Sequence, residues 1–244
     1  MGVASGDRSV PGFPSRNPLP GLLLVGLFLV AAGCAGAPKP KAPPVEPKAG
    51  EDLRSPAALV KSGNLNFSLG RYDQAIAEFT KAIEKGGGDA VVYNTRGRVY
   101  FEKGRYEDAL ADVSRAIELD PGSDAAWNTR GYILYRLKRY EESLRDLGKA
   151  LEINPRHEGA YNHRGLVHTA QGRYDRALAD FDEALNVDPD YNEVYVNKAA
   201  AYEGKGLKRE AVEAYREFLR RASSPRESGR AERARERIRV LTAE

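Results

Sequence analysis

The sequence predicts an all-α protein, an α-solenoid of five helical hairpins closed by one further helix. One observation behind this prediction is a short motif that returns every 34 residues, as YNTRG at 93–97, WNTRG at 127–131 and YNHRG at 161–165. Another is that five expected second-helix starts keep the same interval, reading GRYDQA, GRYEDA, KRYEES, GRYDRA and GLKREA. A hairpin of this length cannot bury its apolar face alone, so stacked neighbours must supply the core.

The composition excludes some classes of partner and site but does not identify the function. The 244 residues carry 38 basic and 35 acidic side chains, a net charge of +3, with no dominant basic patch. This balance argues against a nucleic-acid partner. The single cysteine, Cys34, excludes an intrachain disulfide or a cysteine metal cluster, so packing alone must hold the fold.

Residues 1–33 are expected to be a signal peptide. The apolar run from Leu22 to Ala32 is about 11 residues long, whereas a membrane span needs roughly 20. The segment VAAGC at 30–34 resembles the lipobox of bacterial lipoproteins, although Ala31 stands where that family prefers leucine. The resemblance implies lipidation of Cys34 and, with Ala35 following, retention at the outer membrane. The alternative is that Cys34 is an incidental small residue in an ordinary cleaved signal.

Residues 34–54 are predicted to form a tether that begins at the lipidation cysteine. Five prolines within 35–53 favour a solvated, semi-extended chain. At ~3.1 Å per residue, such a spacer reaches on the order of 50 Å from a membrane surface.

The repeat domain is expected over 55–225, with Ser55 as N-cap and Pro56 at the first helical position. Its five units, numbered one to five below, are 56–89, 90–123, 124–157, 158–191 and 192–225. Their length and small/aromatic pattern resemble the tetratricopeptide repeat (TPR) family, which implies a right-handed solenoid of helix–turn–helix units. Gly86-Gly87-Gly88 replaces the usual proline after unit one, and this predicts a looser joint there.

Helical spacing predicts the packing faces of the inner units. Counted from the first residue of each unit, positions 4, 8 and 11 of the first helix share a face. The glycine at position 8 is expected to face a small residue across the hairpin. The expected neighbours are Gly97 and Ala109, Gly131 and Ser143, and Gly165 and Ala177. Pro121, Pro155 and Pro189 should end the second helices. A capping helix is expected over 226–244, after the capping-box sequence Ser224–Glu227. Its arginines suit a solvating cap, or alternatively a surface for acidic partners.

Position 7 carries arginine in units two to four, where the family normally has leucine. The same three units, and no others, carry aspartate at position 23. Because a buried unpaired guanidinium is costly, we predict helix-to-helix structural ion pairs, within one unit or between adjacent units. They would use Arg96, Asp112, Arg130, Asp146, Arg164 and Asp180.

Resemblance to TPR superhelices implies that positions 2, 5, 9 and 12 line a concave groove. There Asn94, Asn128 and Asn162 form a ladder whose amides could bind the backbone of an extended peptide. Further candidates for side-chain contacts are Arg98, Phe101, Tyr132, Tyr135 and Arg136. The alternative is that the asparagines only bridge neighbouring helices. Position 5 lacks the basic residue of the TPR carboxylate clamp, which disfavours recognition of an acidic C-terminal tail in that manner.

No residues with catalytic or metal-binding spacing stand out. His163 and His168 are five apart and do not share a helix face, and His168 is expected in the core. We therefore expect no enzyme activity, cofactor, metal or small-molecule substrate.

The sequence favours a protein-binding scaffold, a TPR lipoprotein of the bacterial envelope that serves envelope, pilus or secretion assembly. It would be lipid-anchored at the outer membrane, facing the periplasm, with protein or peptide clients in its groove. The alternative is a soluble periplasmic adaptor, or a self-associating scaffold, without a lipid anchor.

Overall fold

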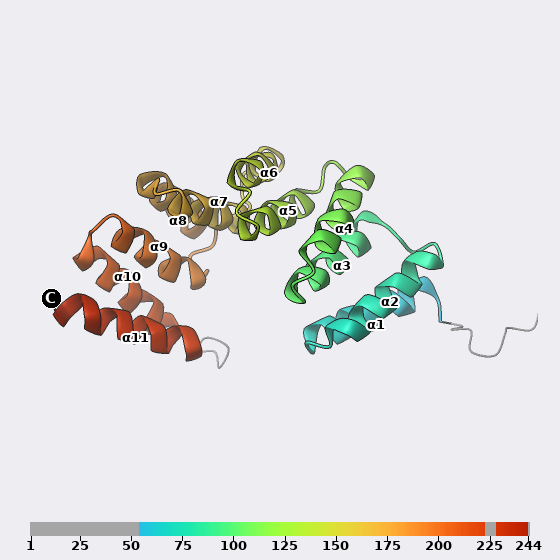
Figure 1. Ribbon diagram of the computed structural model, residues 1–244, viewed down its shortest axis with the longest axis horizontal. Helices are drawn as coiled ribbons and strands as arrows, with labels where there is room; N and C mark the ends of the chain where they lie inside the picture. Colours follow the sequence, from blue (N-terminus) through green and yellow to red (C-terminus); the bar gives the residue numbers. More distant parts are fainter. Residues whose placement is uncertain (1–53, 223–227, 244) are drawn as a thin grey trace, which may run out of the picture. The chain divides into compact units, whose positions relative to one another are not determined.

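The computed structural model describes residues 54–222 and 228–243, which form eleven α-helices and no strand (Figure 1). Each repeat unit supplies two successive helices, and one further helix follows the fifth unit. The helices are α1 (Pro56–Ser68), α2 (Tyr72–Glu84), α3 (Ala90–Glu102), α4 (Tyr106–Leu119), α5 (Asp124–Arg136), α6 (Tyr140–Ile153), α7 (Glu158–Ala170), α8 (Tyr174–Val187), α9 (Glu193–Gly204), α10 (Lys208–Arg221) and α11 (Ser228–Ala243).

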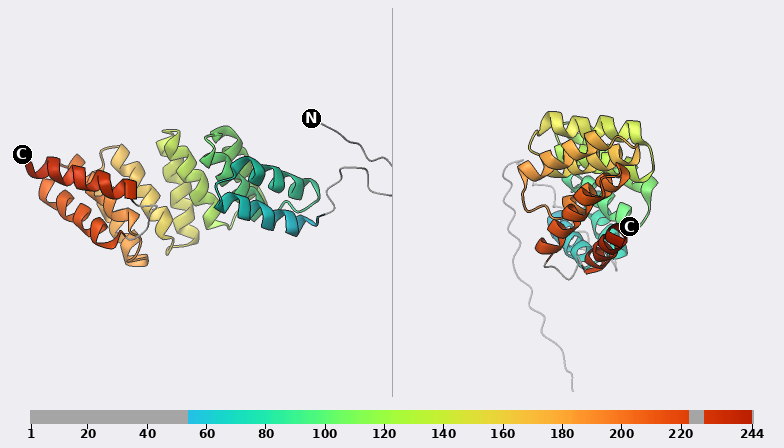
Figure 2. Two further views of the ribbon diagram at one scale, coloured as in Figure 1. Left: turned by 90° about the horizontal axis from the view of Figure 1, so that it is seen from below. Right: turned by 90° about the vertical axis from the view of Figure 1, so that its left-hand side faces the viewer.

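The hairpins stack in chain order (Figures 1 and 2). The two helices of a unit pack together, and each second helix packs against the first helix of the next unit. The first helices α3, α5, α7 and α9 also contact one another in sequence, so they form a continuous side of the array. Contact between α1 and α3 is less extensive than in these later pairs, and it lies at the joint that carries the glycine triplet.

Local sequence explains where the helices begin and end. Ser55, Asp89 and Ser123 accept hydrogen bonds from the backbone at the starts of α1, α3 and α5, satisfying N–H groups that the helix cannot pair. The second helices α4, α6 and α8 end two residues before a proline. The turn inside each hairpin needs a left-handed residue, which is glycine in four units and Lys138, at φ 61°, in unit three.

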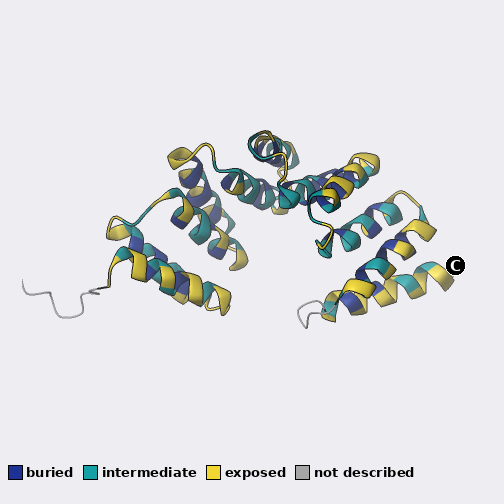
Figure 3. Ribbon diagram, turned by 180° about the vertical axis from the view of Figure 1, so that it is seen from behind, coloured by how far each residue is buried: buried dark blue, intermediate teal, exposed yellow. Residues whose placement is uncertain are grey.

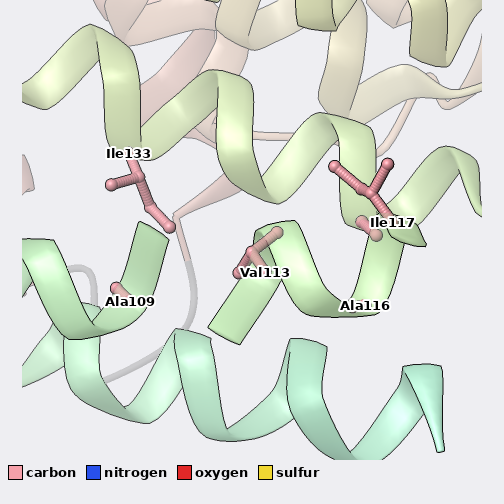
Figure 4. Close-up of a cluster of buried hydrophobic side chains, with 6 residues drawn as sticks. Ala109, Val113, Ala116, Ile117 and Ile133 are labelled. Atoms are coloured by element: carbon pink, nitrogen blue, oxygen red, sulfur yellow. The ribbon is translucent and has the colours of Figure 1, made fainter. Parts of the chain in front are cut away.

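The core lies between neighbouring units. In the cluster around α4, Ala109, Val113 and Ala116 are fully buried together with Ile133 of the next unit (Figure 4). Ile133 is at position 10, and positions 3 and 10 of units two to five are buried throughout, an inter-unit face that the predicted faces did not include. Figure 3 shows these buried segments where the hairpins meet, with exposed residues on the outer sides of the terminal helices.

The glycines at position 8 allow close approach, but mainly of large side chains. A Cβ on Gly131 would lie 2.7 Å from Leu147, and one on Gly165 would lie 2.5 Å from Phe181. The nearest side chain is thus one turn beyond the small residue expected across the hairpin. Ser143 still lies close, since its hydroxyl donates to the Gly131 carbonyl at 2.6 Å. The reason is that a missing side chain on one helix leaves room for a bulky one on the other.

The described part of the capping helix is α11, which packs on α10. It buries Ala231 and Ala234 against the last repeat, with Ile238 and Leu241 beside them. No helix among the described residues is long and apolar enough to span a membrane. The signal segment 1–33, Cys34, the tether up to residue 53 and the capping-box residues 224–227 lie outside the described residues.

Candidate functional site

Arginine and aspartate meet inside each of the three inner hairpins. Arg96 donates from Nε and Nη2 to the two carboxylate oxygens of Asp112, at 2.7 and 2.8 Å. Arg130 and Asp146 repeat this geometry at 2.6 and 2.9 Å, and Arg164 and Asp180 at 3.0 and 2.6 Å. These are the six residues that the sequence predicts to form ion pairs, and the structure places each pair within a single unit. Two parallel bonds satisfy a carboxylate in a fixed orientation, which a lysine could not do.

Each pair is embedded in aromatic and polar surroundings. The guanidinium of Arg130 lies 4.8 Å from the Trp127 ring centre and also donates to Ser114 of the preceding unit at 3.3 Å. Arg96 contacts Thr80 of the preceding unit in the same way at 2.9 Å. The hydrogen bond to Asp180 raises the pKa of the Arg164 guanidinium above its ordinary value, although burial opposes the shift. All three pairs join helices within a unit, and Arg96 and Arg130 also connect their units to the preceding one.

A groove of about 500 Å³ is lined by α3, α5 and α7, and it extends to Tyr191, to Glu193 of α9 and to Arg230 of α11. Six of the eight groove candidates line it: Asn94, Arg98, Phe101, Asn128, Tyr132 and Asn162. Tyr135 and Arg136 lie beside it and contact lining residues. The rings of Tyr135 and Tyr132 stack with centres 6.1 Å apart, and the Arg136 guanidinium lies 5.4 Å from the Phe101 ring centre.

The three asparagines are not equivalent. Asn162 is 1% exposed; its side-chain oxygen accepts from Asn197 at 2.8 Å and its nitrogen donates to the Tyr191 hydroxyl at 3.3 Å. The oxygen of Asn128 lies 2.8 Å from Nδ1 of His163. Both asparagines therefore bridge to the following unit, which is the alternative that sequence reasoning left open.

Asn94 differs because the following unit offers it no donor. Its side-chain oxygen is buried without a hydrogen-bond partner among the described residues. The equivalent of His163 and Asn197 in the next unit is Thr129, whose hydroxyl donates instead to the Ala125 carbonyl at 2.8 Å. A buried acceptor without a partner is costly unless a ligand or water supplies the donor.

His163 joins units three and four, and sequence reasoning missed this role. Its ring stacks on Tyr132 with centres 4.2 Å apart, and burial lowers its pKa to about 3. The imidazole is therefore neutral at physiological pH, and the Nδ1–H tautomer donates to Asn128. The recurrence of a polar residue at position 6, after each ladder asparagine, is the sequence signal that could have indicated it.

Arg98 in the groove and Arg136 beside it each lie over an aromatic ring. The Arg98 guanidinium lies 5.6 Å from the Phe67 ring centre, and Arg136 covers Phe101. Both are exposed, and neither has a carboxylate ion-pair partner within 54–222 or 228–243. Stacking holds such a guanidinium in place while leaving its donors available.

Outside the groove, His168 is buried with Nε2 3.8 Å from Asp180, in the packed position that the sequence suggests. Among the described residues, no group of three or more histidine, cysteine or acidic side chains could hold a metal ion.

Comparison with known proteins identifies the family. Sequence profiles of the tetratricopeptide repeat match residues 94–161, residues 159–191, and residues 56–84 and 193–225. A search of curated protein sequences found no match.

Solved structures with the same fold share little sequence with the chain. TTC0263, a thermophilic TPR protein of Thermus thermophilus, is 24% identical, with a TM-score of 0.66 over 78% of this chain and 100% of that chain. The pilF protein of Pseudomonas aeruginosa is 19% identical, with a TM-score of 0.62 over 76% and 88%. YrrB, described as a TPR protein with an unusual peptide-binding site, is 23% identical, with a TM-score of 0.52 over 72% and 90%. Identities this low bear on the fold alone. The profile matches across all five units place the chain in the tetratricopeptide repeat family, whose members are generally protein-interaction scaffolds.

Proposed function

We propose that this protein is a non-catalytic scaffold of the bacterial envelope that binds an extended segment of a client protein in the groove of units two to four. The observation that carries the proposal is the unpartnered Asn94 oxygen, which lies in a groove that also contains the free guanidinium of Arg98. A client backbone N–H would supply the missing donor. An acidic client side chain would meet Arg98 or Arg136.

The main contacts with the client are expected at the unit-two end of the groove. Asn128 and Asn162 already use their oxygens to bridge units, so they offer a client less than Asn94 does. Phe101 and Tyr132, whose ring centres are 5.2 Å apart, form an aromatic floor next to it. A single backbone hydrogen bond contributes about 1 kcal/mol, so this floor and the arginines must supply most of the affinity.

The test is site-specific capture of clients by the full-length protein in envelope preparations. Asn94→Ala and Arg98→Ala should each lower the recovery of cross-linked clients severalfold. Arg209→Ala is the matched control, because Arg209 is an exposed arginine on α10, away from the groove. If both variants recover as many cross-linked clients as Arg209→Ala does, the proposed binding site is wrong.

We further propose a lipid anchor at Cys34, which rests on the sequence of residues 22–34 alone. Cys34→Ala, or inhibition of prolipoprotein processing, should move the protein from the membrane fraction to the soluble periplasm. Unchanged fractionation would remove the anchor and favour the soluble adaptor. Client capture through the groove is a separate measurement, so either proposal can fail alone.

A further inference from the structure

The first helix of the array exposes the face that every later unit buries. Positions 3 and 10 of units two to five pack against the second helix of the preceding unit. At position 10, Val99, Ile133, Val167 and Ala201 are 0–1% exposed. Unit one has no preceding unit, and its position-10 residue, Leu65, is 60% exposed. Ala58 at position 3 is exposed as well.

This face forms one uncharged stripe along α1 and its C-cap residue, Leu69. Ala58, Ser62, Leu65 and Leu69 follow one another at intervals of four, three and four residues, which places them on one side of a helix. Leu69 is 54% exposed. Position 7, which carries arginine in the inner units, is Ser62 here, so the stripe carries no charge. Leu65 and Leu69 are one helical turn apart, so they form one small apolar patch.

We propose that the α1 stripe, defined as Ala58, Ser62, Leu65 and Leu69, binds the same stripe of a second copy of this chain. The two α1 helices run antiparallel across a twofold axis between residues 63 and 64. In this register Ala58 faces the partner's Leu69, and Ser62 faces the partner's Leu65. Each large residue thus meets a small one, so the stripe is complementary to itself, which an isologous dimer interface requires.

Other occupants fit the stripe less well. The opposite end of the array is α11, whose exposed residues include Glu232, Arg233, Arg235, Glu236 and Arg239, so head-to-tail stacking would place leucines against charges. Pairing of two copies through α1 avoids this contact between leucines and charges.

The size of the surface sets the strength of the association. One stripe on a 13-residue helix is much smaller than the ~800 Å² per partner of a standard interface. The dimer is therefore weak in dilute solution, and confinement at a membrane would raise its population through effective concentration. The inference does not depend on the proposed groove function, because the stripe and the groove use different residues.

Sedimentation velocity of the full-length protein in detergent, over a wide concentration range, tests the association. The wild-type mass should rise from monomer towards dimer, and Leu65→Glu should raise the dimer dissociation constant at least tenfold. Val91→Glu is the matched control, because Val91 is 70% exposed on α3 and lies outside the stripe. Circular dichroism verifies that both variants keep their helices. A wild-type monomer at every concentration, or equal weakening by the control, overturns the proposal.

Disulfide trapping tests the register. In the proposed dimer residue 58 lies beside residue 69 of the partner, whereas the two copies of residue 58 are ~16 Å apart along the helix axis. Mixed Ala58→Cys and Leu69→Cys proteins should therefore cross-link far more than either alone, with the wild type giving the background from Cys34. Equal cross-linking of mixed and single samples overturns the antiparallel arrangement.

Discussion

The three inner repeats and the two outer repeats solve the same packing problem with different chemistry. Units two to four each hold a bidentate arginine–aspartate pair whose aspartate is 5–7% exposed. Unit one has Ser62 and Glu78 at these positions, and Glu78 pairs with Arg54 from outside the repeat. Unit five has Lys198 and Ala214, and Lys198 reaches the exposed Asp182 instead.

In units two to four, each buried aspartate is therefore paired with an arginine, whereas the outer units have no buried aspartate at this position. A buried carboxylate without its partner is strongly destabilising, whereas a complete pair roughly balances the cost of removing both charges from water. The pairs therefore add little net stability. They do restrict which helix faces can meet, because the arginines of units two and three also contact a hydroxyl of the preceding unit.

The largest expected effect comes from breaking one inner pair. Arg130→Ala leaves Asp146 buried without its partner and should lower the free energy of unfolding by about 3–5 kcal/mol. The comparison is Lys198→Ala in unit five, where Asp182 is 56% exposed at its side chain and the expected loss is at most ~1 kcal/mol. Urea unfolding followed by circular dichroism measures both.

Removing both charges of the same pair tests whether the loss in Arg130→Ala comes from the unpaired carboxylate of Asp146. Arg130→Leu combined with Asp146→Leu should recover most of the stability that Arg130→Ala loses, because no charge remains buried. A double variant as unstable as Arg130→Ala would show that the pair is needed for more than neutralising its own charges.

The second effect concerns the glycine at position 8, which unit five replaces with the fully buried Ala199. Gly165→Ala would place a Cβ 2.5 Å from the buried Phe181 ring and should cost about 1–3 kcal/mol through overpacking. Gly148→Ala is the control, because nothing lies within 4 Å of its Cβ position, and it should stabilise α6 by up to ~1 kcal/mol. Losses of equal size in both variants would argue against packing as the cause.

How much could be predicted from the sequence depends on whether a feature repeats. The arginine and aspartate occur together in three units and are absent together in two, so their partnership is readable without coordinates. The inter-unit face at positions 3 and 10 was missed, because the residues there are small or β-branched and merge with the general apolar pattern.

The hydrogen bonds of the asparagine ladder, in contrast, could not be predicted from the repeat pattern. Its three members occupy identical positions, yet their hydrogen bonding depends on whether the next unit offers His163, Asn197 or Thr129. Sequence periodicity gives the position of a side chain. Its hydrogen-bond partners depend on contacts between units that no single repeat encodes.

The third prediction concerns the pH dependence of stability, and it compares the interface between units three and four with the interface between units four and five. The first joint contains His163, whereas the second uses Asn197, which does not titrate in this range. The folded-state pKa of His163, about 3, lies below the ordinary 6.5. Between these values the unfolded chain binds a proton that the folded chain does not, so stability is complete above pH 6.5 and falls by up to ~1.4 kcal/mol per pH unit towards pH 3.

His163→Gln should reduce this acid dependence, since its amide can still donate to Asn128 but cannot take up the proton. Unfolding free energies at intervals from pH 7 to pH 4 provide the measurement. Parallel pH profiles for the wild type and His163→Gln would show that other groups determine the acid sensitivity.

The smallest expected effect concerns the left-handed residue in the turn inside each hairpin. This residue is Lys138 in unit three and glycine in the other four units. Lys138 adopts φ 61° there, and its Cβ makes that conformation cost roughly 1–2 kcal/mol. Lys138→Gly removes this strain but gives the unfolded chain more freedom, so the net gain should be only about 0.5 kcal/mol. The reverse change, Gly172→Lys, should destabilise unit four by a similar amount, because Gly172 has φ 71° and open space around it. Equilibrium unfolding of both variants checks the sign. A loss of stability in Lys138→Gly would mean that the lysine side chain contributes contacts that outweigh its backbone strain.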